Sequence, residues 1–241
     1  MTEGSLPPLD ETWSRALAIV AHPDDLEYGA ASAVARWTSQ GKSISYLLVT
    51  RGEAGIDSLE PAQCGEVRRL EEIASAAVVG VETVEFLDYP DGVVEYGLPL
   101  RRDLARAIRR HRPEVLISIN FRLTWGGRWL NMADHRAVGL AVLDAARDAG
   151  NRWIFPQLVE EGHEPWSGVK MVCFNGSPEP THAVDVTGFL ERGVASLQEH
   201  RAYLAGLGGS TDVDAFLRGP AEAGGKLLGT ELAISFEVFP M

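Results

Sequence analysis

The stretch with the clearest capacity for chemistry is His22-Pro23-Asp24-Asp25, which directly follows a run of apolar residues. His22 and Asp25 are three residues apart, and the ring of Pro23 restricts the backbone between them, so that an imidazole and a carboxylate can reach one cation. Zinc accepts nitrogen and oxygen ligands, and a catalytic zinc site has about three protein ligands and a water. His135, which follows a later strand and opens a helix, is the candidate for the third ligand.

The neighbouring carboxylate, Asp24, has a separate task in this hypothesis. A carboxylate beside a metal-activated water can take its proton and pass it to a leaving group, which is metal-assisted hydrolysis. Spacing alone leaves an alternative open, in which His22 and the two acids cap a helix and bond loop backbone. A second alternative is a mononuclear iron enzyme, because two histidines and one carboxylate also form a facial triad. That triad normally sits on a β-barrel.

Apolar runs alternate with amphipathic helical patterns along the first half of the chain, which predicts βαβ units and a doubly wound parallel sheet. Strands are expected at residues 15–20, 43–50, 82–87 and 114–120, with helices at 30–40, 65–79, 98–111 and 134–149. The second half is less regular, with short strands at 169–175, 183–186 and 233–239 and a helix at 188–204. We predict one domain over residues 1–241, with a flexible extension at 1–14.

Polar residues follow each of the first four predicted strands. Ligands of open parallel sheets bind beyond the carboxyl ends of the strands, so these residues are expected to converge on one crevice. In chain order they are His22 to Asp25, then Arg51-Gly52-Glu53, then Pro90-Asp91-Gly92, and finally the loop that leads to Asp134-His135.

Composition and charge exclude several other classes of protein. The net charge is -12, from 22 basic and 34 acidic residues, so nucleic acid is not an expected partner. The two cysteines form no CxxC pair, which favours a reducing compartment. The first residues lack the pattern of a signal peptide, and no apolar run approaches the roughly 20 residues of a membrane span. We therefore expect a cytoplasmic protein without a membrane span.

Five segments together resemble the LmbE/PIG-L family of zinc-dependent de-N-acetylases, which includes deacetylases of mycothiol and bacillithiol synthesis. They are AHPDD after the first strand, TRGEAG at 50–55, VRRLEEIASAAVVGV at 67–81, LDYPDG at 87–92 and ADHRAVG at 133–139. The resemblance implies a Rossmann-like α/β fold with helices on both faces of a mostly parallel sheet. It also implies hydrolysis of an N-acyl bond, acetyl above all, in an N-acetylglucosaminyl-like glycoside or another small N-acyl molecule. Relatives often form homo-oligomers.

The same resemblance implies a role for particular residues. The zinc ligands would be His22, Asp25 and His135, with Fe²⁺ as the other possible metal, and Asp24 would be the general base. Substrate-binding side chains would be Arg68, Asp91 and Glu53. Each of these three also has a plainer interpretation: Arg68 as an i,i+4 ion pair with Glu72 on a solvated face, and the two acids as loop and turn residues.

The sequence departs from the family pattern at Met132, where relatives have a histidine that is thought to steady the oxyanion. Methionine cannot donate a hydrogen bond or carry charge. We hypothesise that His182 takes over this catalytic task and that Asp134, as a second-layer residue, orients it. The alternatives are that His182 is a surface loop residue, or that the protein is a sugar-binding homologue with impaired catalysis. The retained Asp24 argues against loss of catalysis.

Overall fold

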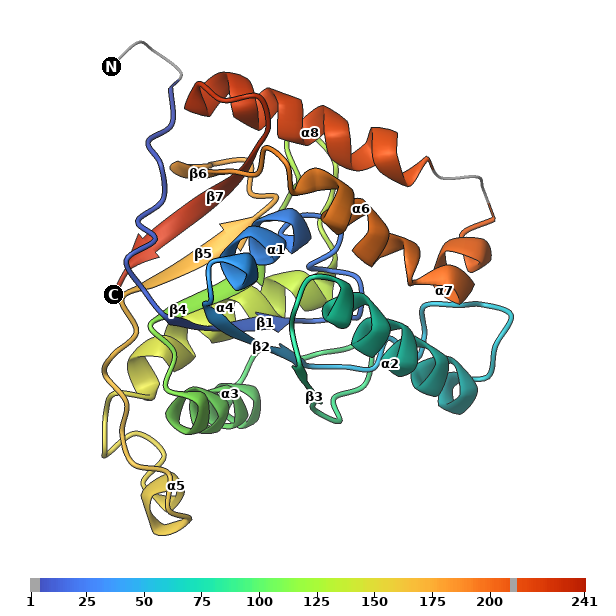
Figure 1. The fold of residues 1–241 in the computed structure, drawn as a ribbon. Coiled ribbons are helices and arrows are strands. Elements are labelled where there is room, and N and C mark those ends of the chain that lie inside the picture. The colour runs from blue at the N-terminus through green and yellow to red at the C-terminus, as the bar shows by residue number, and fades with distance from the viewer. Residues whose placement is uncertain (1–4, 209–211) are drawn as a thin grey trace.

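Seven strands from both halves of the chain form one sheet in the computed structural model, which describes residues 5–208 and 212–241 (Figure 1). The strands are β1 (Arg15–Val20), β2 (Ser43–Leu48), β3 (Thr83–Phe86), β4 (Val115–Ile119), β5 (Met171–Asn175), β6 (His182–Asp185) and β7 (Ala233–Pro240). Their order in the sheet is β3-β2-β1-β4-β5-β7-β6, and β7 runs antiparallel to both of its neighbours. The remaining pairs are parallel, which confirms the predicted mostly parallel α/β fold.

Helices cover both faces of the sheet (Figure 1). One face packs against α1 (Ala31–Ser39), α2 (Pro61–Val78), α6 (Leu190–Gln198) and α8 (Val213–Leu228), and the other against α3 (Leu98–His111) and α4 (Ala133–Asp148). Two short helices, α5 (Gln157–Glu160) and α7 (Arg201–Gly206), complete the described elements. A strand covered on both faces needs apolar residues at every position, which explains the continuous apolar run of β1. None of the described helices is both long and apolar enough to cross a membrane.

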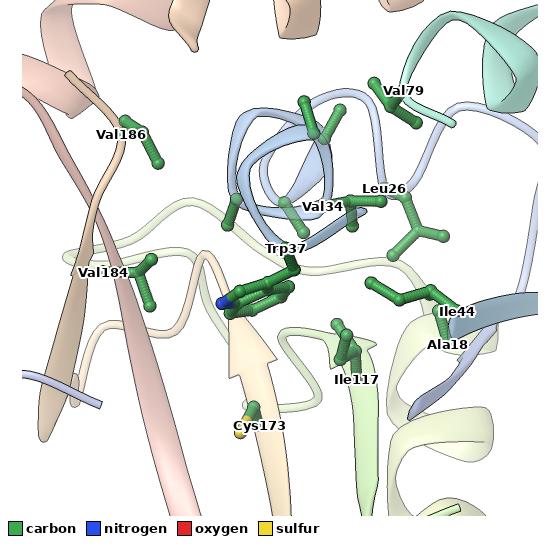
Figure 2. Close-up of a cluster of buried hydrophobic side chains, with 14 of the residues drawn as sticks. Ala18, Leu26, Val34, Trp37, Ile44, Val79, Ile117, Cys173, Val184 and Val186 are labelled. Atoms are coloured by element: carbon green, nitrogen blue, oxygen red, sulfur yellow. The ribbon is translucent and has the colours of Figure 1, made fainter. Parts of the chain in front are cut away.

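The core between α1 and the sheet is built around Trp37, which is completely buried (Figure 2). Its indole N–H donates a hydrogen bond to Glu11, in the segment that precedes β1. In that segment Leu9 and Trp13 are buried as well. Residues 5–14 are thus packed against the domain, which differs from the flexible extension expected at 1–14; residues 1–4 of that extension lie outside the described residues.

The helix α8 is the largest element that the sequence pattern does not predict. Pro220 lies inside it, and Gly224 and Gly225 follow, so its composition is that of a loop. The glycines are needed for packing: a Cβ on Gly224 would lie 2.2 Å from the carbonyl oxygen of Ala233, and one on Gly225 would lie 2.4 Å from that of Glu231. The helix backbone can therefore approach β7 closely.

The direction of winding reverses between β1 and β4, because the chain first adds β2 and β3 on one side of β1 and then β4 and β5 on the other. In doubly wound sheets this switch point opens a crevice at the carboxyl ends of the strands. The segments that follow β1 and β4 carry the HPDD turn and the start of α4, so the fold brings them to the same edge of the sheet.

Candidate active site

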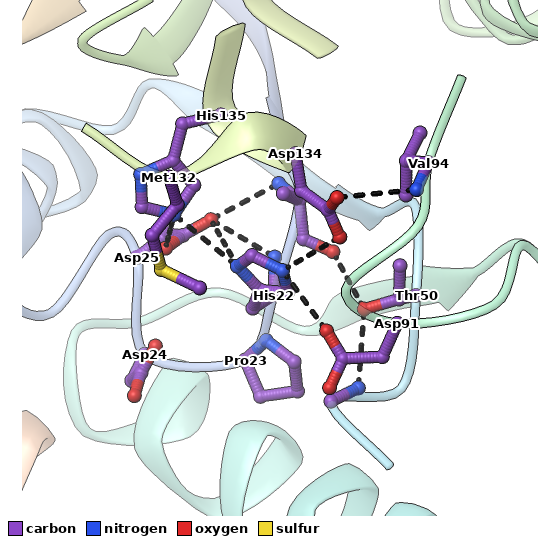
Figure 3. A network of polar contacts seen from close by, with 12 residues as sticks. His22, Pro23, Asp24, Asp25, Thr50, Asp91, Val94, Met132, Asp134 and His135 are labelled. Atoms are coloured by element: carbon purple, nitrogen blue, oxygen red, sulfur yellow. Dashed lines mark hydrogen bonds and ion pairs between the residues drawn. The ribbon is translucent and has the colours of Figure 1, made fainter. Parts of the chain in front are cut away.

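His22, Asp25 and His135 meet at the carboxyl ends of β1 and β4 (Figure 3). The Nδ1 atom of His22 lies 3.2 Å from Nε2 of His135, which lies 2.9 Å from Oδ1 of Asp25. The third separation, from Nδ1 of His22 to Oδ2 of Asp25, is 3.7 Å. Ligand atoms held at about 2.1 Å in a tetrahedral zinc site are roughly 3.4 Å apart. These contacts reach both oxygens of Asp25, and one ligand atom from each of the three residues lies within 4.8 Å of the others, a spacing compatible with a single cation.

The far side of His22 fixes the tautomer of its ring (Figure 3). Its Nε2 atom lies 3.0 Å from a carboxylate oxygen of Asp91 and 3.2 Å from one of Asp134. Backbone N–H groups of Gly92 and Val94 also donate to Asp134, so this carboxylate is an acceptor throughout. Because both partners accept, Nε2 carries the proton and the lone pair on Nδ1 faces inward. Asp134 thus orients a candidate metal ligand.

Asn131 fixes the tautomer of the His135 ring. Its Oδ1 lies 2.9 Å from Nδ1 of His135, and its Nδ2 donates to the backbone carbonyls of Asn120 and Arg122. The amide orientation makes Oδ1 an acceptor, so Nδ1 of His135 carries the proton and Nε2 offers its lone pair inward. Two imidazole lone pairs and a carboxylate facing one another suit a bound cation. Sequence reasoning missed Asn131, although its place four residues before His135 is a usable signal.

The charges around the triad also favour a cation. Burial would raise the pKa of Asp25, but the two imidazoles of His135 and His22 hold it far below its ordinary value. Burial would lower the pKa of His22, but Asp25, Asp134 and Asp91 together raise it well above the usual range. Carboxylates surround these imidazoles, so positive charge at this position is stabilised.

Asp24 lines the same cavity as the three candidate ligands and has an unusual backbone conformation. Its φ of 90° lies in the left-handed region, which a residue with a Cβ seldom adopts. Burial raises the pKa of Asp24 to about 6, and the guanidinium of Arg68 opposes this rise. A carboxylate with a pKa near neutrality can both accept and return a proton, which suits a general base.

Arg68 holds Asp24 in place and is itself almost fully buried, with 3% of its surface exposed. Its Nη2 donates to Oδ2 of Asp24 at 3.0 Å and to the carbonyl of Pro23 at 2.5 Å, and its Nη1 donates to the carbonyl of Gly52 at 3.2 Å. The guanidinium also stacks 4.1 Å from the ring of Tyr203. The structure therefore gives Arg68 a buried contact with the candidate base in place of a solvated ion pair with an acid on its own helix. Because Arg68 also lines the cavity, its expected contact with substrate stays a prediction.

The glycines of the TRGEAG segment make room for this arginine. A Cβ on Gly55 would lie only 2.3 Å from Nη1 of Arg68. We expect Gly55→Ala to displace the guanidinium and to lower kcat about 10- to 100-fold, because small misplacements near the reacting atoms are costly. Steady-state kinetics on the purified variant measure the effect. Gly219→Ala, where an added Cβ meets nothing within 4 Å, is the control, and an unchanged kcat in Gly55→Ala would contradict the role of the close contact.

Glu53 and Asp91 support the site from the loops after β2 and β3. Glu53 accepts the N–H of Asp91 at 2.8 Å, and Asp91 accepts the N–H of Ala54 at 2.9 Å while its other oxygen faces His22. Both oxygens of Asp91 are thus engaged, and Glu53 lies outside the cavity that contains the candidate ligands. These two acids therefore fix the loop that orients His22. Asp91 also lines the cavity, so its expected contact with substrate stays a prediction.

The structure does not bring His182 to the site. It begins β6 at the edge of the sheet, its Nδ1 faces the hydroxyl of Thr181 at 3.0 Å, and it is absent from the cavity wall. The physical reason is that β7 is inserted between β5 and β6, which moves His182 one strand further from the crevice. Asp134, expected to orient it, bonds His22 instead. The hypothesis of His182 as an oxyanion donor is therefore corrected.

The cavity at the site has a volume of about 820 Å³, which is near the upper end of the range for small-molecule sites, roughly 300–1,000 Å³. The candidate ligands, Asp24 and Arg68 form its polar floor. Its outer walls are apolar and come from the loop before α4, from α8 and from β7; they include Trp125, Met132, Phe216 and Ile234. Tyr203 and Phe216 come from parts of the sequence that carry no local signal of a site.

Comparisons with known proteins find relatives that are deacetylases. A diacetylchitobiose deacetylase of Thermococcus kodakarensis is 28% identical over 190 residues, which cover 78% of this chain and 69% of the relative. A 1D-myo-inositol 2-acetamido-2-deoxy-alpha-D-glucopyranoside deacetylase of Rhodococcus erythropolis is 29% identical, over 77% of this chain and 66% of the relative. The solved structure of the N,N'-diacetylchitobiose deacetylase from Pyrococcus horikoshii superposes with a TM-score of 0.86 at 23% identity, covering 95% of this chain and 85% of that one.

The model of the GlcNAc-PI de-N-acetylase family, PIG-L, matches residues 17–146. That segment holds most of β1, all of β2 to β4, the HPDD turn, α2 and most of α4, and so includes every residue of the candidate metal site. Since it is more than half of the chain, the protein belongs to the PIG-L family of hydrolytic N-deacetylases.

Proposed function

We propose that the protein is a zinc-dependent hydrolase that removes an acetyl group from the amine of an N-acetylglucosaminyl compound, with His22, Asp25 and His135 as metal ligands. The observation that supports this most directly is the inward orientation of both imidazole lone pairs, 3.2 Å apart and beside the carboxylate of Asp25. The identity of the relatives as deacetylases of acetylated glucosamine compounds favours the same substrate class.

The division of labour follows from the positions of the residues. Zinc held by these ligands supplies a Lewis acid for the acyl carbonyl and brings the pKa of a water near 7. Asp24 accepts a proton from the attacking water and returns it to the departing amine, while Arg68 holds the carboxylate by its Oδ2 atom. Asp91 and Asp134 keep the proton of His22 on Nε2 throughout.

Oxyanion stabilisation by an imidazole of this chain is not part of the proposal. Met132 lies at the cavity wall but cannot donate a hydrogen bond, and His182 lies elsewhere. Among the described residues that line the cavity, the histidines are His22 and His135, and both serve as candidate ligands.

The apolar outer walls favour a substrate with an apolar or aromatic group attached to the amino sugar. Burying about 60 Å² of such a group at about 25 cal/mol per Å² contributes about 1.5 kcal/mol, or about tenfold in affinity. We therefore expect nitrophenyl N-acetylglucosaminide to have a kcat/KM about tenfold above that of free N-acetylglucosamine.

The test uses protein stripped of metal and then reloaded with Zn²⁺, or with Fe²⁺ under anaerobic conditions. Acetate release from N,N'-diacetylchitobiose and from the two monosaccharide substrates is followed by proton NMR. We expect activity to return with about one equivalent of zinc per chain. Activity that requires Fe²⁺ would overturn the assignment of zinc, and absence of acetate release from all three substrates would overturn the proposed substrate class.

A further inference from the structure

Three titratable side chains that the mechanism does not use lie together behind the HPDD turn. Glu27, Glu72 and His200 have exposed fractions of 1%, 1% and 0%. They come from the loop after β1, from α2 and from the residue before α7. The Nε2 atom of His200 lies 3.6 Å from a carboxylate oxygen of Glu72 and 3.8 Å from one of Glu27. None of the three lines the substrate cavity.

The buried cluster of Glu27, Glu72 and His200 contacts the active site through a hydrogen bond to Asp24. The Oε2 atom of Glu72 accepts a hydrogen bond from the backbone N–H of Asp24 at 3.1 Å. Arg68, four residues earlier on the same face of α2, bonds the carboxylate of Asp24 and the carbonyl of Pro23. Two residues of α2 therefore bond the candidate base at three points. Glu72 accepts the backbone N–H of Asp24, and Arg68 donates to the carbonyl of Pro23 and to the carboxylate of Asp24.

These hydrogen bonds matter because Asp24 has a φ of 90°. A residue other than glycine in such a conformation costs about 1–3 kcal/mol and persists only where its surroundings impose it. The contacts around Asp24 include the hydrogen bond to Glu72, those to Arg68, and the hydrogen bond that the Tyr28 N–H donates to the Asp24 carbonyl. Loss of the acceptor on Glu72 removes the contact on the N–H side of this peptide, so we expect it to relax toward an ordinary conformation and the carboxylate to shift from the reacting atoms.

The surroundings of Glu72 are costly for stability alone. Burial and the nearby carboxylate of Glu27 raise the pKa of Glu72 well above its ordinary value. Within the described part of the chain, Oε1 of Glu72, Oε2 of Glu27 and both ring nitrogens of His200 have no hydrogen-bond partner. Glu27 is anchored from the other side by the hydroxyl of Ser75 at 2.9 Å. Native proteins rarely keep such groups without a functional reason.

We propose that Glu72, which is buried beside His200 and Glu27, is a positioning residue that fixes the left-handed peptide of Asp24 and so aims its carboxylate into the cavity. The inference rests on the proposed function of Asp24 as general base. It adds a layer behind the reacting groups that touches neither substrate nor metal ligand and acts only through the Asp24 N–H.

The experiment is a double-mutant cycle on the zinc-loaded protein. Glu72→Met removes the acceptor at nearly constant volume, and we expect it to lower kcat about 10- to 100-fold with KM and zinc content unchanged. Glu72→Gln keeps an amide oxygen that can accept the Asp24 N–H, and it should restore most of kcat. In an Asp24→Asn background, Glu72→Met should change the residual rate less than about twofold, because its effect passes through Asp24.

Glu66→Met is the matched control, since Glu66 is an exposed acid on the same helix that pairs with Arg69. An equal loss in both backgrounds, a loss of zinc, or a kcat near wild type in Glu72→Met would overturn the inference. If Glu72→Met does not fold, Glu72→Asp takes its place, because the shorter side chain withdraws its oxygens from the Asp24 N–H. Full activity in Asp24→Asn alone would instead refute the proposed base, so the two failures are distinguishable.

Discussion

Replacing His135 with alanine is expected to remove bound zinc and deacetylase activity together. The variant loses one of three candidate ligands, and the remaining pair, His22 and Asp25, offers the cation a single nitrogen ligand. We expect zinc content to fall below about one-tenth per chain and acetate release to fall at least about 1,000-fold, because the Lewis acid is lost with the metal. Metal analysis and NMR on the same preparation measure both quantities.

The matched control is His182→Ala, which removes an imidazole of the same size outside the cavity. Zinc content and kcat should both stay within about twofold of wild type, as for a residue remote from the site. A fully metallated and active His135→Ala protein would refute the candidate metal site. A large loss of kcat in His182→Ala would restore the sequence-based hypothesis that this residue assists catalysis.

Replacing Asp24 with asparagine separates catalysis from metal binding. Asparagine has the same shape, keeps the backbone N–H that Glu72 accepts, and offers Arg68 an amide oxygen, so the turn should stay in place. It cannot accept the proton of the attacking water. We expect kcat to fall about 10²- to 10⁴-fold, the usual contribution of a general base, while zinc content and KM stay near wild type.

Asp88→Asn provides the control for this exchange, because Asp88 is an exposed acid that pairs with Arg51 on the surface. Its kinetics should match those of the unaltered protein. More than about one-tenth of the wild-type kcat in Asp24→Asn would be incompatible with Asp24 as the base. Loss of zinc from that variant would mean that Asp24 supports the metal rather than the proton transfer.

The first half of the fold was predictable from local pattern, and the second half was predictable only in part: its three short strands correspond to β5, β6 and β7, but its helices differ from the prediction. The strands β1 to β4 lie within two residues of their predicted bounds, since each contains β-forming apolar residues and is followed by a helix. The helix α8 was missed because its Pro220 and paired glycines serve contact with β7, which only the tertiary structure reveals. The long helix expected at 188–204 is divided into α6 and α7 at His200, whose ψ of 54° ends the helical path.

The site shows the same division between local and distant information. The types and spacing of His22, Asp25 and His135 point to a metal because ligand chemistry depends on few residues. The contact of Arg68 with Asp24 could not be predicted from the sequence. The i,i+4 relation of Arg68 to Glu72 is compatible both with a solvated ion pair and with two buried residues that bond Asp24. Their exposed fractions of 3% and 1% decide between the two, and those fractions depend on packing against the HPDD turn and α7.

The position of β7 bears on the order in which the protein assembles. This strand is the last of the chain that the structure describes, yet it lies inside the sheet, where it joins β5 to β6. During synthesis, the backbone N–H and C=O groups of β5 that pair with β7 therefore stay unpaired until residues 233–240 leave the ribosome. Ala233, Ile234 and Ser235 also line the substrate cavity, so its wall is complete only after β7 has joined the sheet, whereas the candidate metal ligands all precede β5 in the chain.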